Sequence, residues 1–325
     1  MAMRLGRSAV VSDTGRRRRR NEDSYVCEPP LFAVADGMGG AQAGEVASRL
    51  AAAVLEEANG DELREERIAE LIQEANRRVF QRSHEDPAAS GMGTTMTVAV
   101  TGPGGTVSIG HVGDSRAYRV RAGRLEQLTK DHSLVGELMR SGKLSPEEAE
   151  THPQRSVITR AVGTEADVDV DTFTVDTEPG DVFLLCSDGL TDMVSDEGIQ
   201  SVIAGKEGDL ESAARTLVET ANSSGGEDNI TVVVFEIVEE NASEVEDTVH
   251  LKPGEQPQPD DAEDTLDELD AVPVVDTAVV SAASIEEHLR REEKKQTSQR
   301  RVLPLVLLVL LLAAIAVLVL WGLYR

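Results

Sequence analysis

The stretch Leu31–Gly40 reads LFAVADGMGG, and a second stretch, Val182–Gly189, reads VFLLCSDG. Each is an apolar run that ends on an aspartate followed by a glycine. Such a run predicts a buried strand that carries its terminal carboxylate to a sheet edge, and the glycine allows backbone to approach whatever the carboxylate binds. Two such strand ends predict a sheet-based fold with a site for hard divalent cations at one edge.

Two further aspartates lie in predicted loops that contain glycine. Asp114 lies at a turn between two strand-like runs, and Asp228 lies just before the run Ile230–Ile237. Carboxylates without a cluster of His or Cys favour Mg²⁺ or Mn²⁺ over Zn²⁺. Each of these aspartates alone could belong to an ordinary turn, because turns use the same residues. Four of them, on strand ends that can meet in one place, favour a metal site.

The composition limits the functional classes. The 325 residues are 40% hydrophobic but only 3% aromatic, so the core should be mostly aliphatic. The formal net charge of −27 argues against nucleic-acid binding, which needs a basic surface. An arginine and metal ions can still reverse the local field enough to bind a phosphorylated substrate. Cys27 and Cys186 form no CxxC pair, which favours buried, reduced thiols in a cytosolic domain.

Residues 1–238 are predicted to form one α+β domain. Apolar runs rich in Val, Ile and Leu predict strands, and apolar residues three and four positions apart predict helices. Several strands follow one another closely, so we expect two antiparallel sheets flanked by helices, a four-layer α-β-β-α sandwich. The predicted strands are Leu31–Ala35, Thr95–Val100, Val107–Val112, Ala117–Val120, Val182–Cys186 and Ile230–Ile237, and the predicted helices are Gly44–Glu57, Asp61–Arg82, Leu134–Ser141, Pro146–Thr151 and Leu210–Ser223.

The chain changes character after residue 238. Residues 239–283 are rich in acidic residues, Pro and Thr and lack apolar periodicity, which predicts a disordered linker. Residues 284–301 open with a capping-box pattern and predict a short charged juxtamembrane helix. Residues 302–323 are almost continuously apolar and span about 31 Å as a helix, which predicts a single transmembrane helix.

The residues around that apolar segment predict its orientation. Lys and Arg residues precede it between residues 294 and 301, and Trp321 and Tyr324 lie at its far end, as interfacial aromatics do. The positive-inside rule then places residues 1–301 in the cytoplasm. No signal peptide and no external sensor domain are expected. The expected localisation is the cell membrane, with a single span and a cytoplasmic folded domain.

Nine short motifs follow one another within the predicted domain. They are Asn21–Asp23 (NED), Asp36–Gly40 (DGMGG), Gly44–Ser48 (GEVAS), Gly91–Thr95 (GMGTT), His111–Tyr118 (HVGDSRAY), Leu128–Ser133 (LTKDHS), Ile158–Gly163 (ITRAVG), Ser187–Leu190 (SDGL) and Asp228–Thr231 (DNIT). In content and order they resemble bacterial members of the metal-dependent protein phosphatase family, also called protein phosphatase 2C. The resemblance implies a protein-serine/threonine phosphatase that uses two or three Mn²⁺ or Mg²⁺ ions and a metal-activated water, without a covalent phosphoenzyme.

The resemblance also implies a set of metal ligands. Asp36 would bridge two ions. Asp188 and Asp228 would complete the first ion's site, and the backbone carbonyl of Gly37 would serve the second. Glu22 would hold water molecules of the second ion.

Further residues take roles by the same resemblance. Asp114, together with Asp188, resembles the third-metal site of bacterial members, to which Ser156 would lend a backbone oxygen. Asp23 would orient the attacking water or take its proton. The family's phosphate-binding arginine stands five positions before this aspartate, which selects Arg18 from the run Arg16–Arg20. The neighbouring arginines would be solvated or contact acidic peptide substrates, and a nucleic-acid patch is the alternative.

Met38 marks a departure from the animal members, which carry a histidine here that is proposed as a general acid. A thioether cannot donate a proton, so the source of the leaving group's proton is open between water and His132. A structural role for His132 is the favoured interpretation. Residues 134–153 would form a mobile flap beside the site that selects substrates.

The leading hypothesis is a membrane-tethered phosphatase that opposes bacterial Ser/Thr kinases. Its partners would be phosphoproteins, including those kinases and their substrates, and its catalytic domain would be monomeric. One alternative is a regulatory phosphatase of a sigma-factor pathway, although such relatives often carry a sensor domain. The other is a non-catalytic pseudophosphatase that binds a partner, although such proteins usually lose the metal aspartates.

Overall fold

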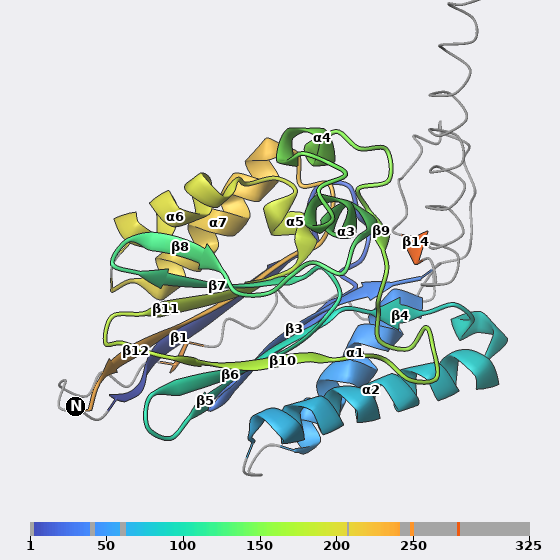
Figure 1. The fold of residues 1–325 in the computed structure, drawn as a ribbon, viewed down its shortest axis with the longest axis horizontal. Coiled ribbons are helices and arrows are strands. Elements are labelled where there is room, and N and C mark those ends of the chain that lie inside the picture. Colours follow the sequence, from blue (N-terminus) through green and yellow to red (C-terminus); the bar gives the residue numbers. More distant parts are fainter. Residues whose placement is uncertain are drawn as a thin grey trace, which may run out of the picture. The chain divides into compact units, whose positions relative to one another are not determined.

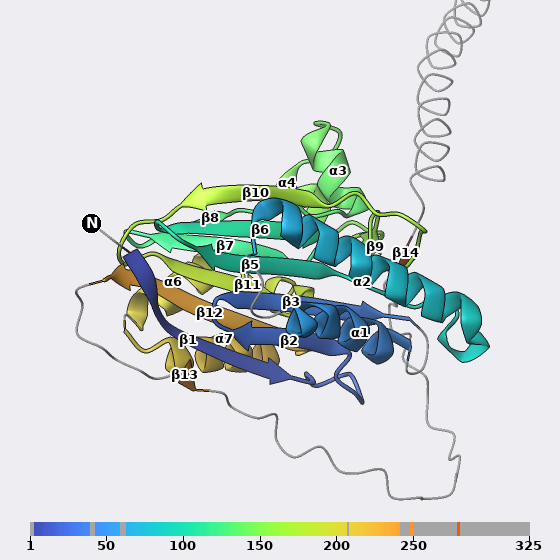
Figure 2. The same ribbon diagram turned by 90° about the horizontal axis from the view of Figure 1, so that it is seen from below.

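The computed structural model describes residues 3–39, 43–58, 63–206 and 208–240, together with 248–249 and 278–279. Two sheets pack face to face, and each is covered on its outer side by helices (Figures 1 and 2). The four-layer sandwich predicted from the sequence is therefore confirmed for this part of the chain.

The first sheet joins strands from both ends of the folded domain. Its order is β13-β1-β12-β11-β7-β8, and all neighbours are antiparallel except the parallel pair of β13 and β1. The helices α5, α6 and α7 cover its outer face (Figure 1). The strands are β1 (Met3–Asp13), β7 (Arg116–Arg121), β8 (Arg124–Gln127), β11 (Val182–Cys186), β12 (Ile230–Glu239) and β13 (Thr248–Val249), and the helices are α5 (Asp188–Thr191), α6 (Asp196–Gly205) and α7 (Leu210–Ser224).

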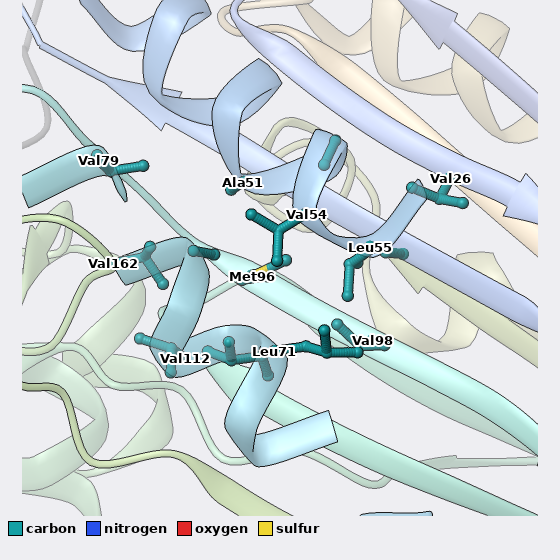
Figure 3. Packing of buried hydrophobic residues seen from close by; sticks show 14 of the residues in the cluster. Val26, Ala51, Val54, Leu55, Leu71, Val79, Met96, Val98, Val112 and Val162 are labelled. Atoms are coloured by element: carbon teal, nitrogen blue, oxygen red, sulfur yellow. The ribbon is translucent and has the colours of Figure 1, made fainter. Parts of the chain in front are cut away.

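The second sheet has the order β10-β6-β5-β3-β2, with the short β4 pairing to β3, and it is antiparallel throughout. The helices α1 and α2 pack on its outer face, where aliphatic side chains interlock (Figure 3). The strands are β2 (Asp23–Glu28), β3 (Leu31–Met38), β4 (Gly93–Thr94), β5 (Met96–Gly102), β6 (Thr106–Val112) and β10 (Asp171–Asp176), and the helices are α1 (Ala43–Glu57) and α2 (Glu65–Glu85).

A stack of three phenylalanines joins the two sheets. The ring centroid of Phe235 on β12 lies 4.2 Å from that of Phe32 on β3 and 5.1 Å from that of Phe183 on β11. Each stacked pair contributes about 0.5–1.5 kcal/mol beyond the area that it buries. Most of the rest of the core is aliphatic, as expected, with Tyr118 as a further buried aromatic, and the stacked rings hold β3 against β11 and β12. The Asp-Gly ends of β3 and β11 therefore have a fixed separation.

The predicted flap contains two short helices, α3 (Leu134–Arg140) and α4 (Pro146–Glu150). Ser133 caps α3 by accepting a hydrogen bond from the backbone N–H of Gly136. Ser145 and Glu148 form a capping box at the start of α4. The short β9 (Val157–Ile158) follows the flap and pairs with β14 (Ala278–Val279). Capping at both helices explains why these short polar stretches are helical.

The sequence did not predict β1, β2, β10 and α6. The strand β10 lies at a sheet edge and alternates weakly, and α6 buries only Ile199 and Ile203, which is too short a pattern to identify a helix. Most of the predicted linker 239–283, the predicted juxtamembrane helix 284–301 and the predicted transmembrane segment 302–323 lie outside the described residues. None of the described helices combines the length and apolar character needed to span a membrane.

Candidate metal centre

The ends of β2 and β3 bring two carboxylates together. In the antiparallel register of these strands, Asp23 lies directly opposite Asp36. Both residues are half-buried at the sheet edge where β3 runs toward α1. The predicted strand end at Asp36 therefore has a second carboxylate beside it from the start of the neighbouring strand.

Two loops of the first sheet supply two more carboxylates. Asp188 begins α5 directly after β11, and Asp228 lies between α7 and β12. A side chain on Gly189 would place its Cβ 2.1 Å from the carbonyl oxygen of Asn229, so the two loops are in close backbone contact. The glycine after Asp188 is required for this approach.

Electrostatic coupling identifies these side chains, with Asp114, as one cluster. Burial first, and then the charges of Asp23, Asp188, Asp228 and Asp114, raise the pKa of Asp36 well above its usual value. Like charges in a partly desolvated site disfavour ionisation of one another. The structure thus brings together the five aspartates that the sequence singled out.

The pKa values of Asp188, Asp114 and Asp23 are shifted in the same direction. Burial and the charges of Asp228 and Asp114 raise the pKa of Asp188 well above its usual value. Burial is also the main reason why the pKa of Asp114 is raised to about 7 and that of Asp23 to about 6. Such clustered, raised pKa values are typical of functional sites.

The free oxygen atoms of the cluster fit hard cations. Within the described part of the chain, the Oδ1 atoms of Asp23, Asp114 and Asp188 are buried without a hydrogen-bond partner. Oxygen donors that lack partners in a strongly negative site are suitable ligands for Mg²⁺ or Mn²⁺. Among the described residues, no group of three or more His, Cys, Asp or Glu side chains is arranged so that it could hold a metal ion as it stands. One oxygen of Asp228 is instead 2.7 Å from Nη2 of Arg18.

Glu22 and Gly37 meet at the start of α1. A Cβ on Gly37 would lie 2.2 Å from the carbonyl oxygen of Gly44, and a Cβ on Gly44 would lie 2.5 Å from Oε2 of Glu22. The first turn of α1 therefore packs against the end of β3 with no room for side chains. This packing places the Glu22 carboxylate beside the Gly37 backbone, as the predicted second ion site requires.

Hydroxyl groups hold one oxygen of Asp23. Ser187 Oγ donates a hydrogen bond of 2.8 Å to Asp23 Oδ2, and Thr231 Oγ1 donates one of 2.6 Å to the same atom. Thr231 Oγ1 is in turn 2.8 Å from Ser12 Oγ, which accepts a bond from Asn21 Nδ2. The sequence patterns did not identify these supporting residues, although Ser187 and Thr231 lie in the same SDG and DNIT motifs as the predicted ligands Asp188 and Asp228.

Arg18 faces the cluster. Burial opposes its positive charge, but Asp228, Asp36 and Glu22 outweigh this and raise the pKa of Arg18. The guanidinium group is therefore a permanent cation among the predicted metal ligands, in a position to meet a phosphate.

The loop of Asp114 is held by His132. The backbone N–H of Gly113 donates to His132 Nδ1 at 3.0 Å, and the backbone N–H of His132 donates to the Gly113 carbonyl at 2.8 Å. His132 Nε2 lies 3.2 Å from Asp171 Oδ2, so both ring nitrogens have partners. Burial, with Arg160 nearby, lowers the pKa of His132 and favours the neutral ring. These contacts support the structural interpretation of this histidine.

Two other residues singled out from the sequence have no recorded hydrogen bond to the aspartates in the described part of the chain. Met38 is buried and packs against Ile158 and Ala161. Ser156 lies between α4 and β9, and none of the hydrogen bonds or ion pairs found in the described residues joins it to the aspartates. Its predicted role at a third ion remains a prediction.

Comparison with known proteins shows which protein family this chain resembles. Residues 17–230 match the family model described as Protein phosphatase 2C. The serine/threonine phosphatase stp of Listeria monocytogenes is 42% identical over 238 residues, which cover 69% of this chain and 93% of that protein. The serine/threonine protein phosphatase PstP of Mycobacterium tuberculosis is 42% identical over 236 residues, which cover 72% of this chain and 45% of that protein.

Solved structures agree with that assignment. The crystal structure of the M. tuberculosis phosphatase PstP/Ppp has a TM-score of 0.68 and 39% sequence identity, over 74% of this chain and 100% of that one. The PstP catalytic domain in complex with 2 manganese ions has a TM-score of 0.66 and 38% identity, over 73% of this chain and 99% of that one.

The raised pKa values predict how pH affects the protein in excess chelator. A carboxyl group with a raised folded pKa contributes stability at low pH that is lost as the pH rises through that pKa. The folded pKa is about 7 for Asp114 and well above the usual range for Asp36 and Asp188. We therefore expect the free energy of unfolding to fall between about pH 7.5 and pH 8.5, mainly through Asp36 and Asp188, in a window that lies above the titration of histidine in the unfolded chain at about pH 6.5.

Urea denaturation at several pH values measures this slope. Saturating Mn²⁺ should reduce it, because the ions replace the protons, and Asp36→Asn should also reduce it. A free energy of unfolding in chelator that rises over this window would contradict the assignment of these aspartates to one desolvated cluster.

Proposed function

Because the chain belongs to the protein phosphatase 2C family, we propose that its aspartate cluster binds two or three Mn²⁺ or Mg²⁺ ions and that these serve protein dephosphorylation. The enzyme is a protein-serine/threonine phosphatase, a hydrolase that depends on Mn²⁺ or Mg²⁺. The observation that carries this conclusion is the cluster of five coupled aspartates at the edge of a phosphatase-family fold.

We assign the ligands of the ions from the packing around the cluster. Asp36 would be shared between two ions, with Asp188 and Asp228 on one side and Gly37 and Glu22 on the other. The contacts of Gly37 and Gly189 with neighbouring backbone support this division. Asp114, with Asp188, would hold a third ion, and Ser156 would lend a backbone oxygen to it.

The contacts of the side chains around the cluster suggest a separate role for each of them in hydrolysis. When bound, divalent cations acidify water and offset the negative charge of phosphoryl oxygens. Ser187 and Thr231 hold Oδ2 of Asp23, so its Oδ1 is left to orient the attacking water and accept its proton. Arg18 would bind the substrate phosphate through its guanidinium group, exchanging part of its contact with Asp228.

The source of the leaving group's proton follows from two exclusions. Met38 has no proton to donate and packs among apolar side chains. His132 has both ring nitrogens engaged, and its pKa is lowered by burial and by Arg160. We therefore assign protonation of the leaving Ser or Thr oxygen to solvent water.

The cellular setting is a further proposal. Residues 302–323 are apolar enough to anchor the enzyme in the cell membrane, with the catalytic domain in the cytoplasm. There it would oppose Ser/Thr kinases by acting on the kinases and their substrates. All of the aspartates expected of an active enzyme are present, which weighs against a pseudophosphatase.

Replacing Asp188 tests the metal assignment. Asp188→Asn should lower kcat at least about 100-fold and remove the rise in Tm that Mn²⁺ gives the wild-type protein, because a first-site ligand is lost. Asp209→Asn is the matched control, since this aspartate caps α7 and asparagine caps equally well. Full phosphatase activity of the wild-type protein in excess EDTA would contradict metal dependence.

Replacing Thr231 tests the positioning of Asp23. Thr231→Val keeps the side-chain shape but removes the hydroxyl, so kcat should fall about tenfold with little change in KM, and Thr231→Ser should restore most of it. Thr177→Val is the control, because Thr177 is buried and hydrogen-bonded to Gly105 at the opposite ends of β6 and β11 from Asp114 and Asp188. Equal kcat values for Thr231→Val and wild type would refute the positioning role.

Removing residues 302–323 tests the membrane anchor. The full-length protein should sediment with membranes and require detergent for release, whereas the shortened protein should remain in the soluble fraction. Removing a similar length from 239–283 should leave the protein with the membranes. Detergent-independent solubility of the full-length protein would disprove the anchor.

A further inference from the structure

The run Arg16–Arg20 is a concentration of positive charge in an acidic protein. The chain has 59 acidic and 32 basic residues, yet five arginines are consecutive here. Arg18 turns toward Asp228, and its side chain is only 24% exposed. Arg16, Arg17 and Arg19 are exposed. We propose that these three form a docking rim for acidic or additionally phosphorylated residues that flank the phosphate to be removed; this inference rests on the proposed function.

The lack of ion pairs distinguishes the rim from several other exposed arginines. Arg77, Arg82 and Arg215 are also exposed, and each is paired with a carboxylate of its own helix. Across the described ranges, no carboxylate forms an ion pair with Arg16, Arg17 or Arg19. Three arginines without an ion-pair partner among the described residues, on a chain with abundant acidic residues, remain available to an anionic partner.

The backbone of the rim is fixed to the catalytic loop. The carbonyl of Gly226 accepts hydrogen bonds from the backbone N–H groups of Arg16 at 2.7 Å and Arg17 at 3.1 Å. Asn229 Nδ2 donates to the carbonyl of Arg20 at 2.9 Å. The backbone of the arginine run is thus hydrogen-bonded to the loop that carries Asp228. A pre-ordered backbone reduces the conformational entropy lost when a flexible peptide binds.

The distance between rim and phosphate site suits an electrostatic contact. Residues two positions apart are separated by at most about 7 Å of backbone, so Arg16, Arg17 and Arg19 all lie close to Arg18. This backbone separation, although not the distance between the guanidinium groups, is comparable to the Debye length of about 8 Å at physiological ionic strength. Charges on substrate residues near the phosphate would therefore interact with the rim, while more distant charges would be screened.

The position of the rim favours a peptide over an anionic membrane surface. A lipid bilayer that covered Arg16, Arg17 and Arg19 would also lie against Arg18 and block access of a phosphoprotein to the aspartates. A peptide whose phosphate is held by Arg18 instead places its flanking side chains on the rim. At that position the positive rim would attract acidic flanking residues, although the protein as a whole carries a net negative charge.

Two phosphothreonine peptides, which differ only in glutamates or glutamines beside the phosphate, test the proposal. With the full-length protein in detergent and Mn²⁺, the glutamate peptide should have a kcat/KM about tenfold higher at low salt, mainly through KM, because charge pairing steers binding. This preference should fall below about twofold at high salt. The triple variant Arg16→Gln, Arg17→Gln, Arg19→Gln should have a preference near unity.

The control is the triple variant Arg77→Gln, Arg82→Gln, Arg215→Gln, which removes the same charge from α2 and α7 and should keep the wild-type preference. Equal kcat/KM values for both peptides with the wild-type protein would overturn the docking rim. Equal loss of this preference in both triple variants would also overturn the docking rim. Rim-dependent binding to phosphatidylserine vesicles, without a preference for the glutamate peptide, would overturn it as well. Failure to hydrolyse either peptide would instead overturn the proposed phosphatase function.

Discussion

Mutual repulsion among carboxylates at one sheet edge is the constraint on which the rest of the structure depends. Asp36 is flanked by Asp23 and faces Asp188, and burial together with these neighbours raises its pKa. Such an arrangement persists only when the surrounding fold holds the side chains in place. The stack of Phe32, Phe235 and Phe183 does so by joining the strands that carry the carboxylates.

The residues around the cluster reduce the repulsion in different ways. Arg18 supplies a positive charge to Asp228, and two hydroxyl groups satisfy one oxygen of Asp23. His132 stays neutral and fixes the backbone next to Asp114. Because these partners leave oxygens of the aspartates unused, the site keeps a ligand set for divalent cations. Positive charge is scarce around this site, so the exposed arginines beside Arg18 are notable, since several other exposed arginines, such as Arg77, Arg82 and Arg215, are paired with carboxylates.

The sequence predicted those parts of the site that strand geometry determines. Asp36 and Asp188 end apolar runs, so their positions at a sheet edge followed from periodicity. Glycine-containing loops next to strands indicated Asp114 and Asp228, and the family resemblance added Glu22, Asp23 and Arg18. The supporting contacts could not be predicted, because the bond from Thr231 to Asp23 joins residues 208 positions apart and depends on how the two sheets pack. Edge strand β10 and helix α6 were missed because few of their side chains are buried.

The central claim is that the aspartate cluster exchanges protons for divalent cations. Calorimetric titration of Mn²⁺ into the chelator-treated full-length protein, repeated at neutral pH in buffers with different ionisation enthalpies, measures that exchange directly. With the pKa of Asp114 at about 7 and those of Asp36 and Asp188 well above the usual range, binding should release at least about one proton, and more at lower pH. Mn²⁺ binding without proton release, or a folded protein that binds no Mn²⁺, would contradict the account.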